Sequence, residues 1–207
     1  MNNKFEESYV KNQDAWNFDK YPLMGRQRID ETLKYKRNFT RTLDIGCGVG
    51  YSTFTLSNTN NVIGIDVSPT TCKRAKINYP KLQFCIADIK HLPFKNKVFG
   101  QISCIDVLEY FKSNLKVPLN EMSRVSKNNA VYIFAVSVGK NGYYDKTKFI
   151  KVISADFTIL KAFPVSCRAT MVLCKYFPKL IQKYLNKIAL IIFSNWHVAF
   201  YCNIKQL

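Results

Sequence analysis

The chain has 207 residues, of which 47% are hydrophobic, so it is long and apolar enough for one domain with a full core, and an intrinsically disordered chain is excluded. Its net charge of +17 favours an anionic partner such as nucleic acid or a membrane surface, although a lysine bias along the whole chain explains it as well. The seven cysteines include no C-x-x-C pair and no secretory signal follows Met1, so we expect reduced thiols and a cytoplasmic protein.

The N-terminal region, residues 1–40, is expected to form a helical cap. Residues 1–14 are polar and are expected to fray, whereas the apolar spacing predicts a helix from about residue 24 to 35. In that helix, Arg26 or Arg28 suits the carboxylate of a ligand, because a guanidinium matches carboxylate geometry. A solvated helix face is the alternative for both arginines.

The stretch Leu43–Gly50 (LDIGCGVG) comes next, with a glycine at every second position from residue 46. It predicts a buried strand, a tight turn and a short helix, with a ligand at the carboxyl end of the strand. The spacing is G-x-G-x-G and not the G-x-G-x-x-G of dinucleotide sites, and Asp44 at the strand end would repel a pyrophosphate. A carboxylate there attracts a cation, so these residues favour S-adenosylmethionine (SAM), which carries an ammonium and a sulfonium and has no phosphate.

An aspartate follows each of the first three predicted strands. Asp66 closes the strand 61–65, about 20 positions after the first glycine, where a ribose-binding carboxylate is expected. Asp88 closes the strand 82–87 and is placed to accept a hydrogen bond from an adenine amino group, with a surface loop position as the alternative. Together with Asp44, this repeated pattern predicts a ligand site along one edge of the sheet.

Alternating strands and helices continue to the C-terminus. Ser68 and Pro69 are typical of a helix start, and His91 is interpreted as a structural loop residue and not a base. An apolar helical insertion is expected at about 166–195. It either packs onto the sheet or contacts a membrane surface, and the sequence is consistent with both. Three further helices are expected: one over 69–78, one around Leu119 to Val125, and a short one that ends near residue 153. Four further strands are expected over 100–105, 131–136, 157–163 and 196–204.

Six motifs resemble, in order and spacing, the class I SAM-dependent methyltransferases with a type 11 methyltransferase domain. They are Leu43–Gly50, Gly64–Ser68, Ala87–Asp88, Leu92–Phe94, Val107–Tyr110 and Glu121–Lys127. Asp14–Phe18, followed by Arg26 and Arg28, also looks like the N-terminus of nodulation protein S-like methyltransferases. The resemblance implies an α/β, three-layer, Rossmann-like fold: a seven-stranded, mostly parallel sheet with an antiparallel last strand and helices on both faces, as one domain over residues 41–207.

The resemblance also implies a set of contacts with SAM as the cofactor. Asp66 would bind the ribose hydroxyls, with Val67 against the adenine, and Asp88 with Ile89 would hold the adenine edge. The methionine end would be bound by Asp44, Gly46, Cys47, Gly48, the backbone at Cys104 or Ile105, and Arg26. No metal is implied.

Candidates for catalysis follow the fourth predicted strand: Asp106, Glu109 and Tyr110, with Tyr143 and Tyr144 as lid residues. The family often has histidine where Tyr110 stands, so a histidine base is not available at that position. Three functions are considered. The favoured one is methyl transfer to a small molecule, either a saccharide or glycan intermediate or a lipid-like metabolite. The alternatives are methylation of an RNA such as a transfer-RNA base, and a non-catalytic interaction protein with this fold.

Overall fold

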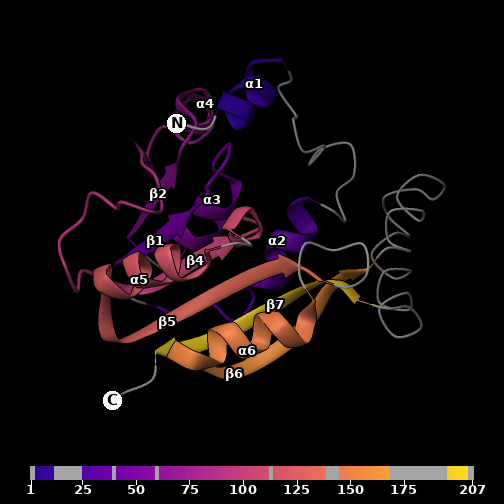
Figure 1. Ribbon diagram of the computed structural model, residues 1–207. Coiled ribbons are helices and arrows are strands. Elements are labelled where there is room, and N and C mark those ends of the chain that lie inside the picture. Colours follow the sequence, from indigo (N-terminus) through magenta and orange to yellow (C-terminus); the bar gives the residue numbers. More distant parts are fainter. Residues whose placement is uncertain are drawn as a thin grey trace.

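The structure is a computed structural model that describes residues 3–11, 25–38, 41–58, 61–111, 114–138, 145–167 and 195–204. Seven strands form one sheet in the order β3-β2-β1-β4-β5-β7-β6 (Figure 1). Their bounds are β1 (Thr42–Ile45), β2 (Val62–Asp66), β3 (Gln83–Ile86), β4 (Phe99–Ile105), β5 (Ser126–Ser137), β6 (Phe157–Cys167) and β7 (Asn195–Ile204).

Strands β1 to β5 pair in parallel, and β7 is antiparallel to both β5 and β6. The predicted seven-stranded, mostly parallel sheet with an antiparallel last strand is therefore confirmed. The strand order reverses at β1, which lies between β2 and β4, and residue Asp44 is paired with Gly64 on one side and Ser103 on the other. Ligands of open α/β sheets bind beyond the carboxyl ends of the strands at such a reversal.

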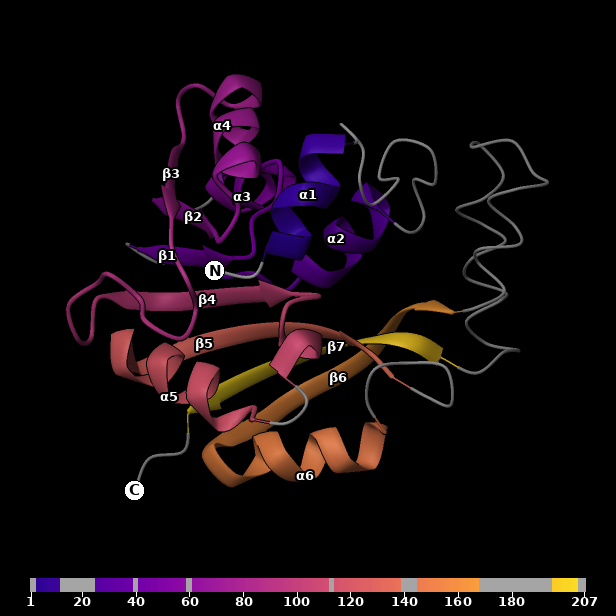
Figure 2. The same cartoon turned by 45° about the horizontal axis from the view of Figure 1, so that its top comes forward.

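Helices cover both faces of the sheet (Figure 2). On one face, α5 and α6 bury Leu119 and Phe149 with Phe134 of β5, and on the other, α2 and α3 bury Leu33 and Leu56 with strand residues of their own core. The helices are α1 (Asn3–Lys11), α2 (Arg26–Leu33), α3 (Tyr51–Ser57), α4 (Pro69–Asn78), α5 (Lys116–Val125) and α6 (Lys146–Asp156), with a short 3-10 helix η1 (Leu108–Phe111).

Local signals determine several element boundaries as predicted. Ser68 is the N-cap of α4, because its hydroxyl accepts a hydrogen bond from Thr71 N at 3.1 Å, and Pro69 is the first helical residue. Gly64 lets β2 approach its neighbours closely, since a Cβ there would lie 2.6 Å from the Thr53 hydroxyl and 2.8 Å from Phe84. Strand β2 is thereby packed closely against helix α3 and strand β3.

Two expectations were wrong. Residues 3–11 form helix α1 instead of fraying, because Tyr9 is buried on the body of the protein. Strand β6 continues through Pro164 to Cys167 instead of closing at residue 163. A proline is tolerated there because β6 is an edge strand, paired with β7 alone.

The helical insertion expected at about 166–195 lies almost entirely outside the described residues, as do Tyr143, Tyr144 and the segment Asp14–Phe18. Among the helices that the structure describes, none is long and apolar enough to cross a membrane.

Candidate functional site

The glycine loop folds back onto the end of β2. The amides of Gly46 and Cys47 both donate to Ile65 O, at 2.8 and 2.9 Å. Gly46 has φ +71° and Gly48 has φ +52°, values that L side chains rarely adopt. A Cβ on Gly46 would lie 2.1 Å from Val107 Cγ2, so glycine is required there for space as well as for its conformation.

Asp44 lies beneath this loop with its carboxylate buried. The hydroxyls of Ser52 and Thr53, in the first turn of α3, donate to its Oδ2 at 2.6 and 2.7 Å. Burial raises the pKa of Asp44 to about 6. The carboxylate thus contributes negative charge from inside the protein, and its direct contact with a cofactor stays a prediction.

We expect Asp44→Asn to stabilise the protein at pH 7.5. Burial raises the pKa of Asp44 from 3.8 to about 6, so ionisation above pH 6 favours the unfolded state by up to about 3 kcal/mol. The stability that protonated Asp44 contributes is fully present below pH 3.8 and is lost as the pH rises through 6. Asparagine keeps an acceptor for Ser52 and Thr53 but carries no charge.

Urea unfolding of the wild type and Asp44→Asn between pH 4 and 8 measures this difference. The two proteins should be similar in stability near pH 4, and the variant should be more stable above pH 6. A gap in free energy of unfolding that does not change with pH would show that folding does not shift the pKa of Asp44.

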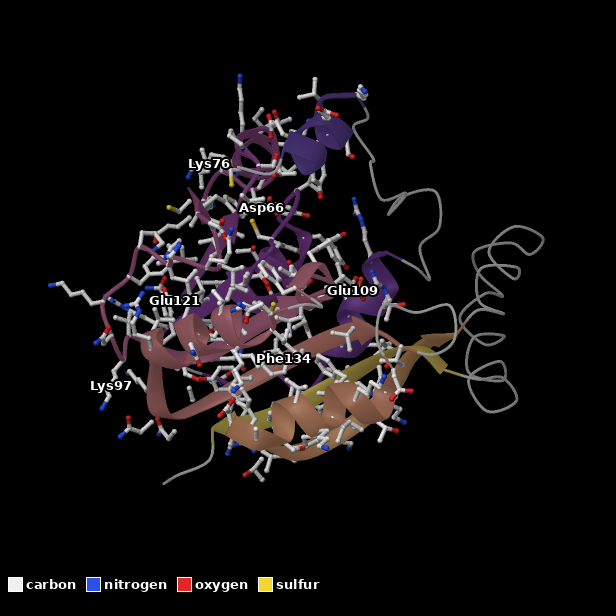
Figure 3. All side chains as sticks on the ribbon, viewed as in Figure 1. Asp66, Lys76, Lys97, Glu109, Glu121 and Phe134 are labelled. Carbon is white, nitrogen blue, oxygen red and sulfur yellow. The ribbon has the colours of Figure 1, made fainter. Side chains whose placement is uncertain are left out.

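Asp66 joins the glycine loop to the start of α4. Its Oδ2 accepts from Gly48 N at 3.0 Å, and its Oδ1 accepts from Ser68 N at 2.9 Å. Burial is the largest influence on this carboxyl group and raises its pKa. A carboxylate oxygen accepts more than one hydrogen bond, so both oxygens retain capacity for the hydroxyls of a ligand. Figure 3 shows Asp66 at the β2 end of the site.

A cavity of about 240 Å³ lies next to Asp66. Its lining combines apolar walls with the Asp88 carboxylate and the His91 imidazole, which suits a flat heterocycle with an amino group. Lys90 contacts the Asp88 carboxylate twice. Its backbone N donates to Oδ1 at 3.0 Å, and its Nζ forms an ion pair with Oδ2 at 3.3 Å. Ile89 is buried beside it. The lining residues are Val67, Ile86, Ala87, Asp88, His91 and Pro93.

Arg124 of α5 holds the loop that forms one wall of this cavity. Its guanidinium donates to Phe94 O and Leu92 O at 2.8 and 2.9 Å and pairs with Glu121, whose carboxylate accepts from Leu92 N at 2.9 Å. Hydrogen bonding to Arg124 lowers the pKa of Glu121. Both residues belong to a motif that carried the resemblance, but no role was assigned to them from the sequence.

Helix α1 covers the open side of the glycine loop, next to α4 in both views (Figures 1 and 2). The Glu6 carboxylate accepts from Ser68 Oγ at 2.5 Å and from the hydroxyl and amide of Thr70. These hydrogen bonds lower the pKa of Glu6. The Tyr9 hydroxyl lies 3.4 Å from where a Cβ on Gly48 would be. Sequence reasoning missed this cover, although the surplus hydroxyls at the start of α4 were a signal for an acidic partner.

Arg28 and Asp106 form an ion pair where β4 ends. Arg28 is buried, at 6% exposed, and Asp106 adopts φ +57°, a left-handed conformation that is uncommon for aspartate. Arg26 instead lies exposed with its guanidinium carbon 5.1 Å from the centre of the Tyr51 ring. The structure therefore brings Arg28 and not Arg26 to the strand mouth, and the predicted cofactor contact of Arg26 stays a prediction.

The other two catalytic candidates lie in η1 and differ in their surroundings. Glu109 is buried and accepts a hydrogen bond from Ser137 N, which ties η1 to the end of β5 (Figure 3). Tyr110 is 44% exposed. Asp106 and Tyr110 are thus more accessible to an acceptor than Glu109, whose carboxylate already has a structural partner.

Three further predicted cofactor residues are buried. Cys104 and Ile105 lie within β4, and burial keeps the Cys104 thiol neutral by raising its pKa far above the ordinary value. The neighbouring Cys72 thiol and burial raise the pKa of Cys47 well above its ordinary value. Any contact of these residues with a ligand would therefore be through backbone atoms or neutral thiols.

Comparisons with known proteins agree with this geometry. Residues 43–134 match the family model described as a methyltransferase domain. An uncharacterized protein of Methanocaldococcus jannaschii is 32% identical over 161 residues, which are 76% of this chain and 59% of that protein. The malonyl-[acyl-carrier protein] O-methyltransferase of Hamiltonella defensa is 33% identical over 113 residues, or 54% of this chain and 43% of that protein.

The whole fold has a solved counterpart. The N-methyltransferase NodS of Bradyrhizobium japonicum, solved with S-adenosylhomocysteine (SAH), superimposes with a TM-score of 0.74 over 98% of both chains at 16% identity. The chain spans about half the length of the curated relatives that it matches. The matched region, its motifs and the strand order together show that residues 43–134 belong to the methyltransferase domain family, with the fold of the class I SAM-dependent methyltransferases.

Proposed function

We propose that the chain is a SAM-dependent methyltransferase that acts on a small-molecule acceptor, with a saccharide or glycan intermediate or a lipid-like metabolite as the favoured class. The observation that carries the proposal is the continuous row of features at one edge of the sheet. The glycine loop, the Asp66 carboxylate and the adjoining cavity occur there in the order in which the methionine, ribose and adenine parts of SAM are joined.

The residues present fit SAM. The turn at Gly46 and Gly48, both of which have positive φ, would hold the methionine end, Asp66 would accept from the ribose hydroxyls, and the cavity beside Asp88 would take the adenine. When bound, SAM supplies a methyl group on a sulfonium, which is a good leaving group. The Tyr9 hydroxyl of α1 lies next to Gly48, where it would help to exclude water from the bound cofactor.

The same residues disfavour a dinucleotide. A pyrophosphate would bind at the N-terminus of α3, where helix amides and the helix dipole attract anions. The buried Asp44 carboxylate instead accepts from Ser52 and Thr53 in the first turn of that helix. Its negative charge offsets the positive helix end and repels phosphate, while it attracts the ammonium and sulfonium of SAM.

Asp106 and Tyr110 are the groups offered to the acceptor. Methyl transfer needs alignment of the nucleophile with the methyl group, and a base only where the nucleophile loses a proton early. The ion pair with Arg28 fixes the direction of the Asp106 carboxylate, so it can orient a hydroxyl or amine. The comparison proteins are an O-methyltransferase and an N-methyltransferase, so the methylated atom is left open.

RNA is the second candidate acceptor, and the net charge of +17 favours it. We also propose a cytoplasmic location, which is supported by the free thiols of Cys47, Cys72, Cys85, Cys104 and Cys202.

Transfer of tritium from methyl-labelled SAM tests the acceptor class. Saccharides and amino sugars, lipid-like carboxylic acids and unmodified transfer RNA would be incubated separately with the wild type, and Asp66→Ala would serve as the control for cofactor-dependent labelling. Label in a small molecule is the expected result. Label confined to RNA would overturn the small-molecule assignment, and absence of label from every class would overturn the activity as proposed.

A further inference from the structure

A basic and aromatic surface lies on the α2 side of the sheet and shares no residue with the cofactor site. We define it by Lys34, Tyr35, Arg37, Lys161, Phe163 and Tyr201. We propose that this surface binds single-stranded nucleic acid, with phosphates on the lysines and a base against the exposed guanidinium of Arg37, which lies over the Tyr201 ring. The proposal rests on contacts outside the cofactor site and holds whichever acceptor is correct.

The sequence concentrates positive charge at this point. Between residues 34 and 41 (KYKRNFTR) there are four cations and no acidic residue. Strand β6 contributes Lys161 from far along the chain. Glu31 pairs with Lys34 at 3.0 Å, so part of the charge of Lys34 is compensated, but Arg37 and Lys161 add to the field.

Aromatic rings hold these cations in place. The Lys161 ammonium lies 4.1 Å from the centre of the Tyr35 ring, and the Lys34 ammonium lies 5.3 Å from the centres of both Tyr35 and Phe163. Tyr35 and Phe163 pack edge to face with their centres 5.0 Å apart. Each cation is therefore less free to move than an ordinary surface lysine, which reduces the entropy lost on binding an anion.

Two further contacts extend the surface. The Arg37 guanidinium carbon lies 5.5 Å from the centre of the Tyr201 ring, and Arg37 N donates to Gln101 Oε1 at 3.0 Å, which fixes the backbone at that position. Hydrogen bonding to Lys161 lowers the pKa of the Tyr35 hydroxyl, as expected where positive charge is concentrated. An exposed guanidinium plane next to lysines is an arrangement that suits an unpaired base and its phosphate.

Nucleic acid fits this surface better than a lipid membrane. Tyr35 and Phe163 are half-buried, Tyr201 is buried, and cations lie over all three rings, so no apolar group of this surface projects to enter a bilayer. The surface is also close to the strand mouth. Arg28 and Lys34 are six residues apart along α2, a distance of about 9 Å at 1.5 Å per residue. A strand bound at the surface can therefore reach the mouth of the site.

Fluorescence anisotropy with a labelled oligouridylate tests the proposal. The variant Arg37→Gln/Lys161→Gln removes two charges from the surface, and Lys148→Gln/Lys151→Gln, on the exposed side of α6, is the matched control with the same net charge. We expect at least tenfold weaker binding for the first variant and less than threefold for the control. The slope of log K against log salt should fall by about 1.4 in the first variant, at about 0.7 per phosphate contact on a single strand.

Equal weakening in the two variants would show that the net charge alone is responsible and would overturn the proposal. Binding of acidic lipid vesicles or of an acidic protein with no binding of the oligonucleotide would also overturn it. Unchanged SAH affinity and unchanged thermal unfolding of both variants establish that the cofactor site and the fold are intact. A failure of methyl transfer with normal oligonucleotide binding would count against the proposed function and not against this surface.

Discussion

A Gly46→Ala variant should be less stable than the wild type by about 2–5 kcal/mol and should lose SAH binding. Gly46 has φ +71°, which costs an L residue about 1–2 kcal/mol. A Cβ there would also lie 2.1 Å from Val107 Cγ2, and overpacking of this kind costs about 1–3 kcal/mol more. Thermal unfolding and calorimetric titration with SAH measure the two effects.

Two further variants separate the clash from the backbone strain. Gly48→Ala is the matched control, because Gly48 also has positive φ but its Cβ would meet only the Tyr9 hydroxyl, at 3.4 Å. Gly48→Ala should therefore lower the free energy of unfolding only by the backbone strain, about 1–2 kcal/mol. Adding Val107→Ala to Gly46→Ala removes the clashing methyl group and should recover part of the stability. If the double variant is no more stable than Gly46→Ala, the contact with Val107 does not determine the requirement for glycine.

Replacing Asp66 by alanine should weaken SAH binding about a hundredfold or more. Hydrogen bonds to a charged group contribute about 1.5–3 kcal/mol each, and the ribose presents two hydroxyls. The variant should also be less stable, because the amides of Gly48 and Ser68 lose their acceptor. Asp66 therefore has a structural role in addition to its expected contact with the ribose.

Asp88→Ala is the control for this effect. The carboxylate of Asp88 is held by Lys90, whereas that of Asp66 bonds the glycine loop itself, so the loss of Asp88 should reduce the affinity for SAH by less and leave the stability nearly unchanged. Titrations would be run well below the unfolding temperature of each variant. Wild-type affinity in Asp66→Ala would show that the ribose assignment is wrong.

The strands, the glycine loop and the cap of α4 could be predicted because their signals are local. Glycines at alternate positions need no knowledge of distant residues, and neither does the Ser68-Pro69 helix start. The three strand-end aspartates were found for the same reason. Parallel pairing of β1, β2 and β3 then places those aspartates at one edge of the sheet.

The features that sequence reasoning missed depend on partners far apart in the chain. Glu6 bonds Ser68 and Thr70 more than sixty residues away, and this contact orders a helix that composition alone assigns to a fraying terminus. The choice between Arg26 and Arg28 depends on which one faces Asp106, and no local pattern determines that. No local pattern indicates either that the Glu109 carboxylate accepts a hydrogen bond from Ser137 N, which lies 28 residues further along the chain.

Calorimetric titration of the purified chain with SAH, and in parallel with NAD⁺, tests the central claim most directly. The claim is that the glycine loop, Asp66 and the adjoining cavity form a SAM site and not a dinucleotide site. It predicts saturable binding of SAH at one site per chain and no heat of binding with NAD⁺. Binding of NAD⁺ in preference to SAH, or the absence of SAH binding to the folded protein, would contradict it.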